Sequence, residues 1–309
     1  HCVTRRQRQM CIRDSSESLD FNLGLFYTTT SDYPRYDRLI QKKEGQLRSA
    51  VWDYTPQEWI NGNFRLTHKG FSLYDKSIFT LSYQNFKEGR RDRDFGDTIL
   101  YETKEKVNAY TSALDFIKKF GKSKLFYGLE YVYNKVNSLG KQTNLLNGAT
   151  SETSPRYPDD SNWQSMAAYV SLQSKLAANL SLQLGLRYNH ILLYANYDNP
   201  FYDFPFIESD INTGALTGSV GFNWQASEIL GWRFNLSTAF RAPNIDDVGK
   251  IFDSEPGSVV LPNPDLKPEY AYNGELGAVL KLGNKTRIDL TGYLTFLEDA
   301  LVRRDYNIN

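Results

Sequence analysis

The 309-residue chain has only two cysteines, Cys2 and Cys11, and both lie in its first fifteen residues. The remaining residues therefore hold neither a disulfide framework nor a cysteine-based metal site. The chain also lacks any apolar run near the roughly 18 residues that a transmembrane helix needs, which excludes a helical membrane protein. Lys and Arg number 36 and Asp and Glu number 36, so no excess of positive charge indicates a nucleic-acid partner.

Motifs of the common enzyme classes are missing as well. The sequence has no nucleophile elbow, no zinc-binding histidine pair, no P-loop and no dinucleotide-binding glycine motif. Histidine is scarce: there are three in the chain, and beyond the first residue they are His68 and His190. We therefore expect a protein that is not an enzyme and has no cofactor or metal site of its own.

Alternation of apolar and polar residues is the dominant pattern of the chain, and it predicts strands with one apolar face. The clearest case is 180–189, LSLQLGLRYN, in which Leu and Tyr alternate with Gly and polar residues. Aromatic residues near predicted strand ends (Tyr188, Trp224, Trp232 and Phe240) are typical of the girdles of membrane barrels. The pattern predicts about twelve strands, at residues 18–28, 45–54, 58–69, 76–87, 98–118, 124–135, 162–176, 180–194, 214–226, 232–241, 269–282 and 286–298.

From residue 70 onward the predicted connections alternate between short and long, which places all short turns at one end of the sheet. This is the layout of an outer-membrane barrel. A soluble β-sandwich shows the same alternation of residues, but its strands rarely reach 12 residues. We therefore expect an all-β fold, an antiparallel transmembrane β-barrel with its apolar side chains toward lipid. The short connections are 70–75, 120–123, 177–179, 227–231 and 283–284, and the long ones are 88–97, 136–161, 195–213 and 242–268.

Residues 1–15 stand apart from this pattern. They carry four arginines, show no strand or helix periodicity and lack the apolar core of a secretion signal. The string RQRQMCIRDS is similar to translated library-adaptor sequence. We therefore expect residues 1–15 to be a non-native lead outside the fold, and we assign residues 16–309 to the barrel.

The most specific pattern lies between residues 240 and 276. Phe240-Arg241-Ala242-Pro243 and Asn263-Pro264-Asp265-Leu266 resemble the FRAP and NPNL-type boxes of TonB-dependent outer-membrane receptors. Three further segments, 28–39, 50–59 and 83–93, resemble the Bacteroidetes members of this family that take up haem, haemoglobin and transferrin iron. The resemblance implies a barrel of about 22 strands plugged by an N-terminal domain. About twelve strands would then make the chain a partial barrel without the plug.

The resemblance also implies a function. Such a receptor lies in the outer membrane of a Gram-negative bacterium, in contact with lipid, and contacts TonB through its plug. It would import an iron source, haem or a haem protein. A ferric-siderophore or cobalamin receptor, or a non-transport barrel used for adhesion or structure, is the alternative.

The candidate ligand-binding residues lie in the predicted long loops. Pro243 cannot donate to a strand ladder, so the first box should end its strand and leave Asn244 and the Asp246–Asp247 pair free at the rim. These loops either shape a ligand site or only brace the rim. The candidates from the two boxes are Arg241, Pro243, Asn244, Asn263, Pro264, Asp265 and Leu266.

Three other features complete the candidates. The loop 195–213 is aromatic, with Tyr197, Phe201 and Tyr202, and either binds an apolar macrocycle, an aromatic siderophore or a protein, or packs on itself. No histidine lies between the two boxes, which leaves His190, near the outer end of its strand, and less favourably His68, toward the short-turn end, as candidate haem-iron ligands. The alternative for His190 is an ordinary surface or girdle residue. The run 88–97 either grips an anionic ligand through its arginines or forms internal ion pairs.

Overall fold

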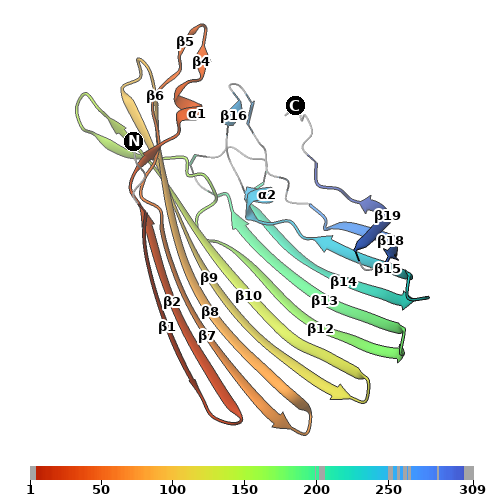
Figure 1. Cartoon of the computed structure of the whole chain (residues 1–309). Coiled ribbons are helices and arrows are strands. Elements are labelled where there is room, and N and C mark those ends of the chain that lie inside the picture. Colours follow the sequence, from red (N-terminus) through yellow and green to blue (C-terminus); the bar gives the residue numbers. More distant parts are fainter. Residues whose placement is uncertain are drawn as a thin grey trace.

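The computed structural model describes residues 5–198, 200–201, 206–249, 253–255, 258–259, 263, 266–283 and 285–302. Twelve strands form one antiparallel meander, in the order β1-β2-β7-β8-β9-β10-β12-β13-β14-β15-β18-β19. Figure 1 shows them side by side in an open, curved sheet. The bounds are β1 (Arg5–Ser15), β2 (Leu19–Thr30), β7 (Glu58–Phe71), β8 (Tyr74–Asp94), β9 (Ile99–Phe120), β10 (Ser123–Asn144), β12 (Ser161–Ala177), β13 (Leu180–Asn196), β14 (Glu208–Gln225), β15 (Leu230–Arg241), β18 (Glu269–Leu282) and β19 (Thr286–Glu298).

The remaining elements lie in the connections at one end of this sheet. Two helices of a single turn, α1 (Tyr36–Leu39) and α2 (Ile245–Gly249), are found there. No helix within the described residues is long and apolar enough to cross a membrane. The short strands are β3 (Tyr33–Pro34), β4 (Lys42–Lys43), β5 (Gln46–Leu47), β6 (Ser49–Tyr54), β11 (Thr150–Thr153), β16 (Asp253–Glu255) and β17 (Ser258–Val259).

The predicted all-β antiparallel fold is confirmed. Each predicted strand except 45–54 corresponds to a strand of the meander, and the predicted short turns close one end of the sheet. Three of these turns contain glycines with positive φ, Gly70 at +80°, Gly121 at +54° and Gly283 at +63°, a conformation that costs other residues about 1–2 kcal/mol. Tight turns of this kind let each strand pair directly with the next.

The structure departs from the predicted organisation of the chain in three places. Residues 5–15 form β1, which pairs with β2 from Arg5 opposite Thr30 to Ser15 opposite Asp20. A strand at the edge of a sheet pairs through its backbone N–H and C=O groups, so it can form without a clear alternation of side chains. Met10 and Ile12 are the large apolar side chains of this strand. Residues 45–54 give only the short strands β5 and β6, and β6 pairs with β3 and β8 outside the meander.

The predicted long loop 88–97 is also mostly strand. β8 continues to Asp94, and only residues 95–98 connect it to β9. β10 likewise continues to Asn144 before its connection begins. Strands β8, β9 and β10 are therefore 21, 22 and 22 residues long, about twice what a membrane span requires. They project beyond the rest of the sheet at the long-loop end (Figure 1).

The sheet has one apolar and one polar face, as the alternation predicts. We call the first the outward face. It carries Leu129, 59% exposed, and Leu186, 50% exposed, together with an aromatic row of Tyr83, Tyr110 and Tyr133. The residues between them in sequence form the inner face, which is largely polar and is covered near the long-loop end by the connections. Because apolar and polar residues alternate along each strand, the large exposed apolar side chains lie on the outward face.

Candidate functional site

The first box ends β15 and starts α2. Arg241 is the last residue of β15, and Pro243 is fully buried. The side-chain oxygen of Asn244 accepts hydrogen bonds from the backbone N–H groups of Asp246 (2.8 Å) and Asp247 (3.1 Å), and Asp247 accepts one back from the N–H of Asn244 (3.0 Å). Arg241 forms an ion pair with Asp247 at 2.6 Å. The box is therefore a reciprocal helix cap, and Asn244 and Asp247 are not free at the rim as predicted.

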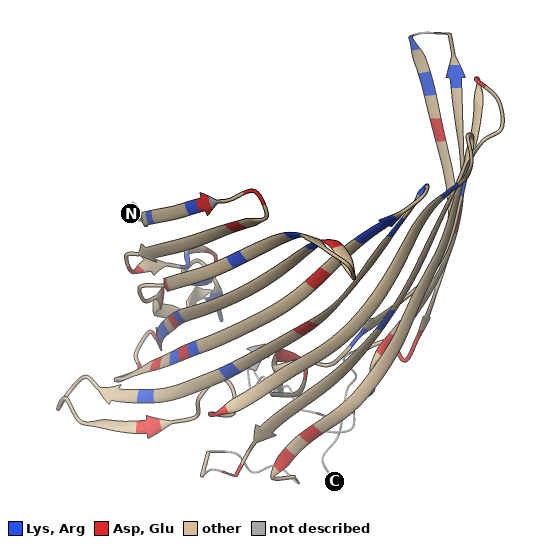
Figure 2. Cartoon of the chain, turned by 90° about the horizontal axis from the view of Figure 1, so that it is seen from below, with Lys and Arg blue, Asp and Glu red and all other residues tan. Residues whose placement is uncertain are grey.

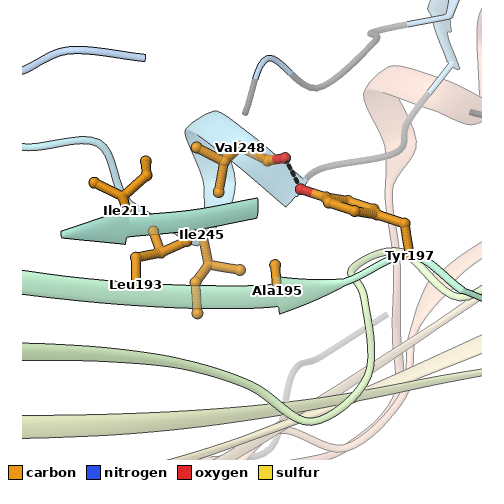
Figure 3. Close-up of a cluster of buried hydrophobic side chains, with 6 residues drawn as sticks. All are labelled: Leu193, Ala195, Tyr197, Ile211, Ile245 and Val248. Carbon is orange, nitrogen blue, oxygen red and sulfur yellow. Dashed lines mark hydrogen bonds between the residues drawn. The ribbon is translucent and has the colours of Figure 1, made fainter. Parts of the chain in front are cut away.

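The apolar side of α2 packs against the inner face of the sheet (Figure 3). Val248 is fully buried and Ile245 is 8% exposed. They contact Leu193 on β13 and Ile211 on β14, which lie opposite one another in the strand ladder. The cluster, which we call the rim cluster, consists of Leu193, Ala195, Tyr197, Ile211, Ile245 and Val248.

Tyr197 connects the aromatic loop to α2. It lies one residue beyond β13, its ring is buried, and its hydroxyl donates a hydrogen bond to the carbonyl oxygen of Val248. Its ring also packs edge-on against Phe206, with centroids 5.2 Å apart. Phe201 is 38% exposed, and Tyr202 lies outside the described residues. Part of the aromatic loop therefore packs on the rim cluster.

A second connection braces α2 from the side of β10. The hydroxyl of Tyr157 donates to a carboxylate oxygen of Asp246 at 2.7 Å. Burial and this hydrogen bond both raise the pKa of Tyr157, so the phenol remains protonated and able to donate. The Tyr157 loop is held by Ser138 on β10, whose hydroxyl oxygen accepts from the backbone N–H groups of Arg156 and Tyr157, both at 3.2 Å.

Charged side chains extend this brace across to β8. The guanidinium of Arg156 lies 5.1 Å from the centroid of the Tyr157 ring and 3.5 Å from the carboxylate of Glu88. Glu88 also forms an ion pair with Arg90 at 2.6 Å, and all three charged side chains are less than one-fifth exposed. Partly buried pairs are screened less than surface pairs, so this network helps to fix the loop.

Glu105 is the buried acid of this network. It lies opposite Glu88 in the ladder and is 7% exposed. Burial raises the pKa of Glu105, and the positive charges of Arg156 and Arg90 oppose that shift. The inner face near the long-loop end is thus both charged and poorly solvated.

The second box meets the first at the rim cluster. Leu266 is partly buried and packs against it. Asn263 is exposed, and Pro264 and Asp265 lie outside the described residues. The structure therefore brings Tyr197 and Leu266 to the helix that follows the first box, although the three segments are separate in sequence.

His190 lies elsewhere. It is on the outward face of β13, two residues from Tyr188, whose hydroxyl lies 3.3 Å from its Nδ1. His68 is also on the outward face, near the short-turn end, with its Nδ1 3.1 Å from the Tyr74 hydroxyl. Neither histidine shares the face of the rim cluster.

The three segments that carried the subclass resemblance meet in one projecting arm, to which they contribute β3, α1, β6 and the end of β8. β6 pairs with β3 and with residues 90–94 of β8. The guanidinium of Arg35 lies 4.9 Å from the Trp52 ring, and that of Arg90 lies 5.0 Å from the Tyr54 ring. Figure 1 shows this arm rising above the rest of the sheet, and Figure 2 shows Lys and Arg together with Asp and Glu along the strands of the sheet. The charge run 88–97 therefore forms ion pairs and stacks within the protein.

Several residues of the site were missed by sequence reasoning. Ile245 and Val248 are spaced as one face of a helical turn, and Asn244 and Asp247 have the spacing of a capping box, so both signals were present. Tyr157 had no such signal, because its partner is 89 residues away. Within the described part of the chain, no group of three His, Cys, Asp or Glu residues could hold a metal ion. The arrangement suits binding rather than bond-breaking chemistry.

Comparison with known proteins gives the family. The sequence profile described as "TonB dependent receptor-like, beta-barrel" matches residues 12–309. The iron-regulated outer membrane virulence protein of Vibrio cholerae is 21% identical over 252 residues, covering 81% of this chain and 32% of the relative. The hemoglobin-haptoglobin utilization protein B of Neisseria meningitidis is 31% identical over 126 residues, covering 39% of this chain and 15% of the relative.

A solved structure shows the same fold. The copper transporter OprC superposes with a TM-score of 0.77 at 13% identity, covering 96% of this chain and 46% of that chain. The chain thus spans about a third of the first curated relative and about half of this structure. It belongs to the TonB dependent receptor-like β-barrel family, and so is a protein of the Gram-negative outer membrane and not an enzyme.

Proposed function

We propose that the chain forms about half of the barrel of an active transporter that imports an iron source, haem or a haem protein. In this proposal further strands close the barrel, a plug fills its lumen, and TonB pulls on the plug to drive import. Family membership supports the transport role. The names of two relatives, one iron-regulated and one for hemoglobin-haptoglobin utilization, support the iron source. The sequence resemblance of segments 28–39, 50–59 and 83–93 supports the subclass.

The observation that carries this proposal is the rim cluster. Structured connections fold onto the inner face at the long-loop end, where family barrels open to the outside. Tyr157 and Tyr197 hold α2 there, with Arg156 and Arg90 beside it. A mouth whose connections are held in place in this way suits recognition of a large extracellular ligand. A plain structural barrel would need no such brace.

The face of the histidines shapes the haem proposal. His68 and His190 both point away from the lumen, so we propose that this part of the barrel does not supply a histidine to haem iron. Tyrosine can ligate haem iron. Tyr157, however, is hydrogen-bonded to Asp246 and has a raised pKa, which opposes the phenolate form. In this proposal the rim contacts the porphyrin or its carrier protein and leaves iron ligation to other parts.

The second candidate is a ferric-siderophore or cobalamin receptor. The same outward histidines favour it, because a preformed chelate needs no ligand from the protein. The inner-face arginines Arg90 and Arg156, which pair with Glu88 in this structure, would then exchange that partner for the anionic chelate. Copper, the substrate in the name of the structural relative, needs soft or imidazole ligands, and the described inner face near the rim offers none.

Growth on defined iron sources separates these candidates. Cells without receptors of their own would express the receptor that contains this chain and receive haem, haemoglobin or a ferric siderophore as sole iron source, with and without TonB. We expect TonB-dependent growth on haem or haemoglobin and a Soret shift when the purified receptor is titrated with haem. Growth on the siderophore alone would favour the second candidate. Growth that is independent of TonB, or absent on every source, would overturn the transport role.

His190→Ala provides a control within the same experiment. Because His190 lies on the outward face, we expect the variant to bind haem with unchanged affinity. A clear loss of affinity or of the Soret shift would show that His190 takes part in haem binding.

A further inference from the structure

Five lysines gather on the outward face where β8, β9 and β10 extend toward the long-loop end. Each lies an even number of residues beyond the aromatic row of Tyr83, Tyr110 and Tyr133, and therefore on the same face. Three adjacent strands contribute to the patch, which we call the lysine patch. Its members are Lys87, Lys104, Lys106, Lys135 and Lys141.

Strand length places this patch at the edge of the membrane. A transmembrane strand takes roughly 9–11 residues. On β10 the outward apolar series begins at Leu125, and a span of that length ends at Lys135. The aromatic row lies just below the patch, as aromatic girdles lie at membrane interfaces. Since the long loops of such barrels are extracellular, the lysine patch lies at the headgroups of the outer leaflet.

The charges of the patch are incompletely neutralised within the protein. Lys87 lies directly opposite Lys106 in the ladder, and like charges in that position destabilise a sheet. Glu58 pairs with Lys87 at 2.9 Å, Asp160 with Lys135 at 2.6 Å and Glu102 with Lys141 at 3.9 Å. Among the described residues, Lys104 and Lys106 have no carboxylate within 4.0 Å, and both are exposed. An anion between Lys87 and Lys106 would remove their repulsion.

We propose that the lysine patch binds the phosphate groups of lipid A, the phosphorylated glycolipid of the outer leaflet. Ammonium groups are compact charges that suit phosphate. The acyl chains of the same lipid would lie on the exposed apolar side chains below, among them Leu81 and Leu129. The existing pairs are exposed and contribute little, so phosphates can replace the carboxylates. One lipid therefore satisfies both the charged patch and the apolar surface beneath it.

The test uses the purified receptor that contains this chain and the double variant Lys104→Gln with Lys106→Gln. Binding is measured by native mass spectrometry with diphosphorylated lipid A, fully dephosphorylated lipid A and phosphatidylglycerol. A basic residue at an anionic membrane surface contributes about fivefold in affinity, so two lysines should account for about thirtyfold. We expect that loss for diphosphorylated lipid A in the variant, and a similar loss for wild-type receptor with the dephosphorylated lipid.

Two further variants keep the result interpretable. Lys42→Gln with Lys43→Gln removes the same charge from the exposed β4 strand and should leave binding unchanged. Lys104→Arg with Lys106→Arg keeps the charge and should bind as the wild type does. Unchanged lipid A binding in the Gln variant, or binding that ignores the phosphates, would overturn the proposal. Equal affinity for phosphatidylglycerol would overturn the assignment to lipid A.

Discussion

Truncating Ile245 to alanine should release α2 from the inner face while the barrel strands remain folded. Ile245 is 8% exposed and packs with Leu193 and Ile211. Truncation of a buried Ile to Ala costs about 2–5 kcal/mol. We expect the lower end, because α2 is a single turn and its neighbours can close partly over the cavity. About 2 kcal/mol corresponds to a roughly thirtyfold larger population of the undocked state.

Hydrogen exchange read by mass spectrometry over residues 242–249 measures this population. Peptides from β9 and β10 report on the barrel and should exchange as in the wild type. Ile207→Ala makes the same change at an isoleucine that is 67% exposed, and its effect should stay within about 0.5 kcal/mol. Exchange over 242–249 that matches the wild type in the Ile245 variant would refute the docking of α2.

Three further predictions follow from the same structure. Tyr157→Phe removes a hydrogen bond to a carboxylate, worth about 1.5–3 kcal/mol, and should speed exchange in α2 at least tenfold, whereas Tyr36→Phe at an exposed tyrosine should not. Leu186→Arg on the outward face should lower the free energy of unfolding, measured by urea titration in liposomes, by about 2–4 kcal/mol. Gln183→Arg on the inner face should lower it far less, and equal losses would contradict the assignment of the faces. Burial raises the pKa of Glu105, so the folded state holds that proton more tightly than the unfolded state. The protonated side chain therefore contributes stability that is fully present below the ordinary pKa of 4.5 and is lost as the pH rises through the folded-state pKa. Glu105→Gln should therefore have the higher urea midpoint at pH 7 and an equal one at pH 4, and a lower midpoint at pH 7 would contradict the assignment.

The sequence alone predicted which face of the sheet each strand residue lies on, but it did not predict which residues from other segments contact it. Leu184 and Leu186 alternate with polar residues, so their common face was predictable, and the structure confirms it. The same periodicity places His190 with those leucines, although its closeness to the strand end suggested a ligand. The capping pattern of Asn244 and Asp247 was also present in the sequence, and its reading as free rim residues was wrong.

Alternation along the chain determined the strands, the short turns and the two faces, because these depend on neighbours one or two residues apart. Pro243 in the first family box determined where β15 ends and the connection to β18 begins. Only the tertiary structure decided that Tyr157, Tyr197 and Leu266 meet α2, and that residues 90–94 pair with β6 instead of forming a loop. Such contacts join segments tens of residues apart, and their energy exists only once the curved sheet has brought those segments onto one face.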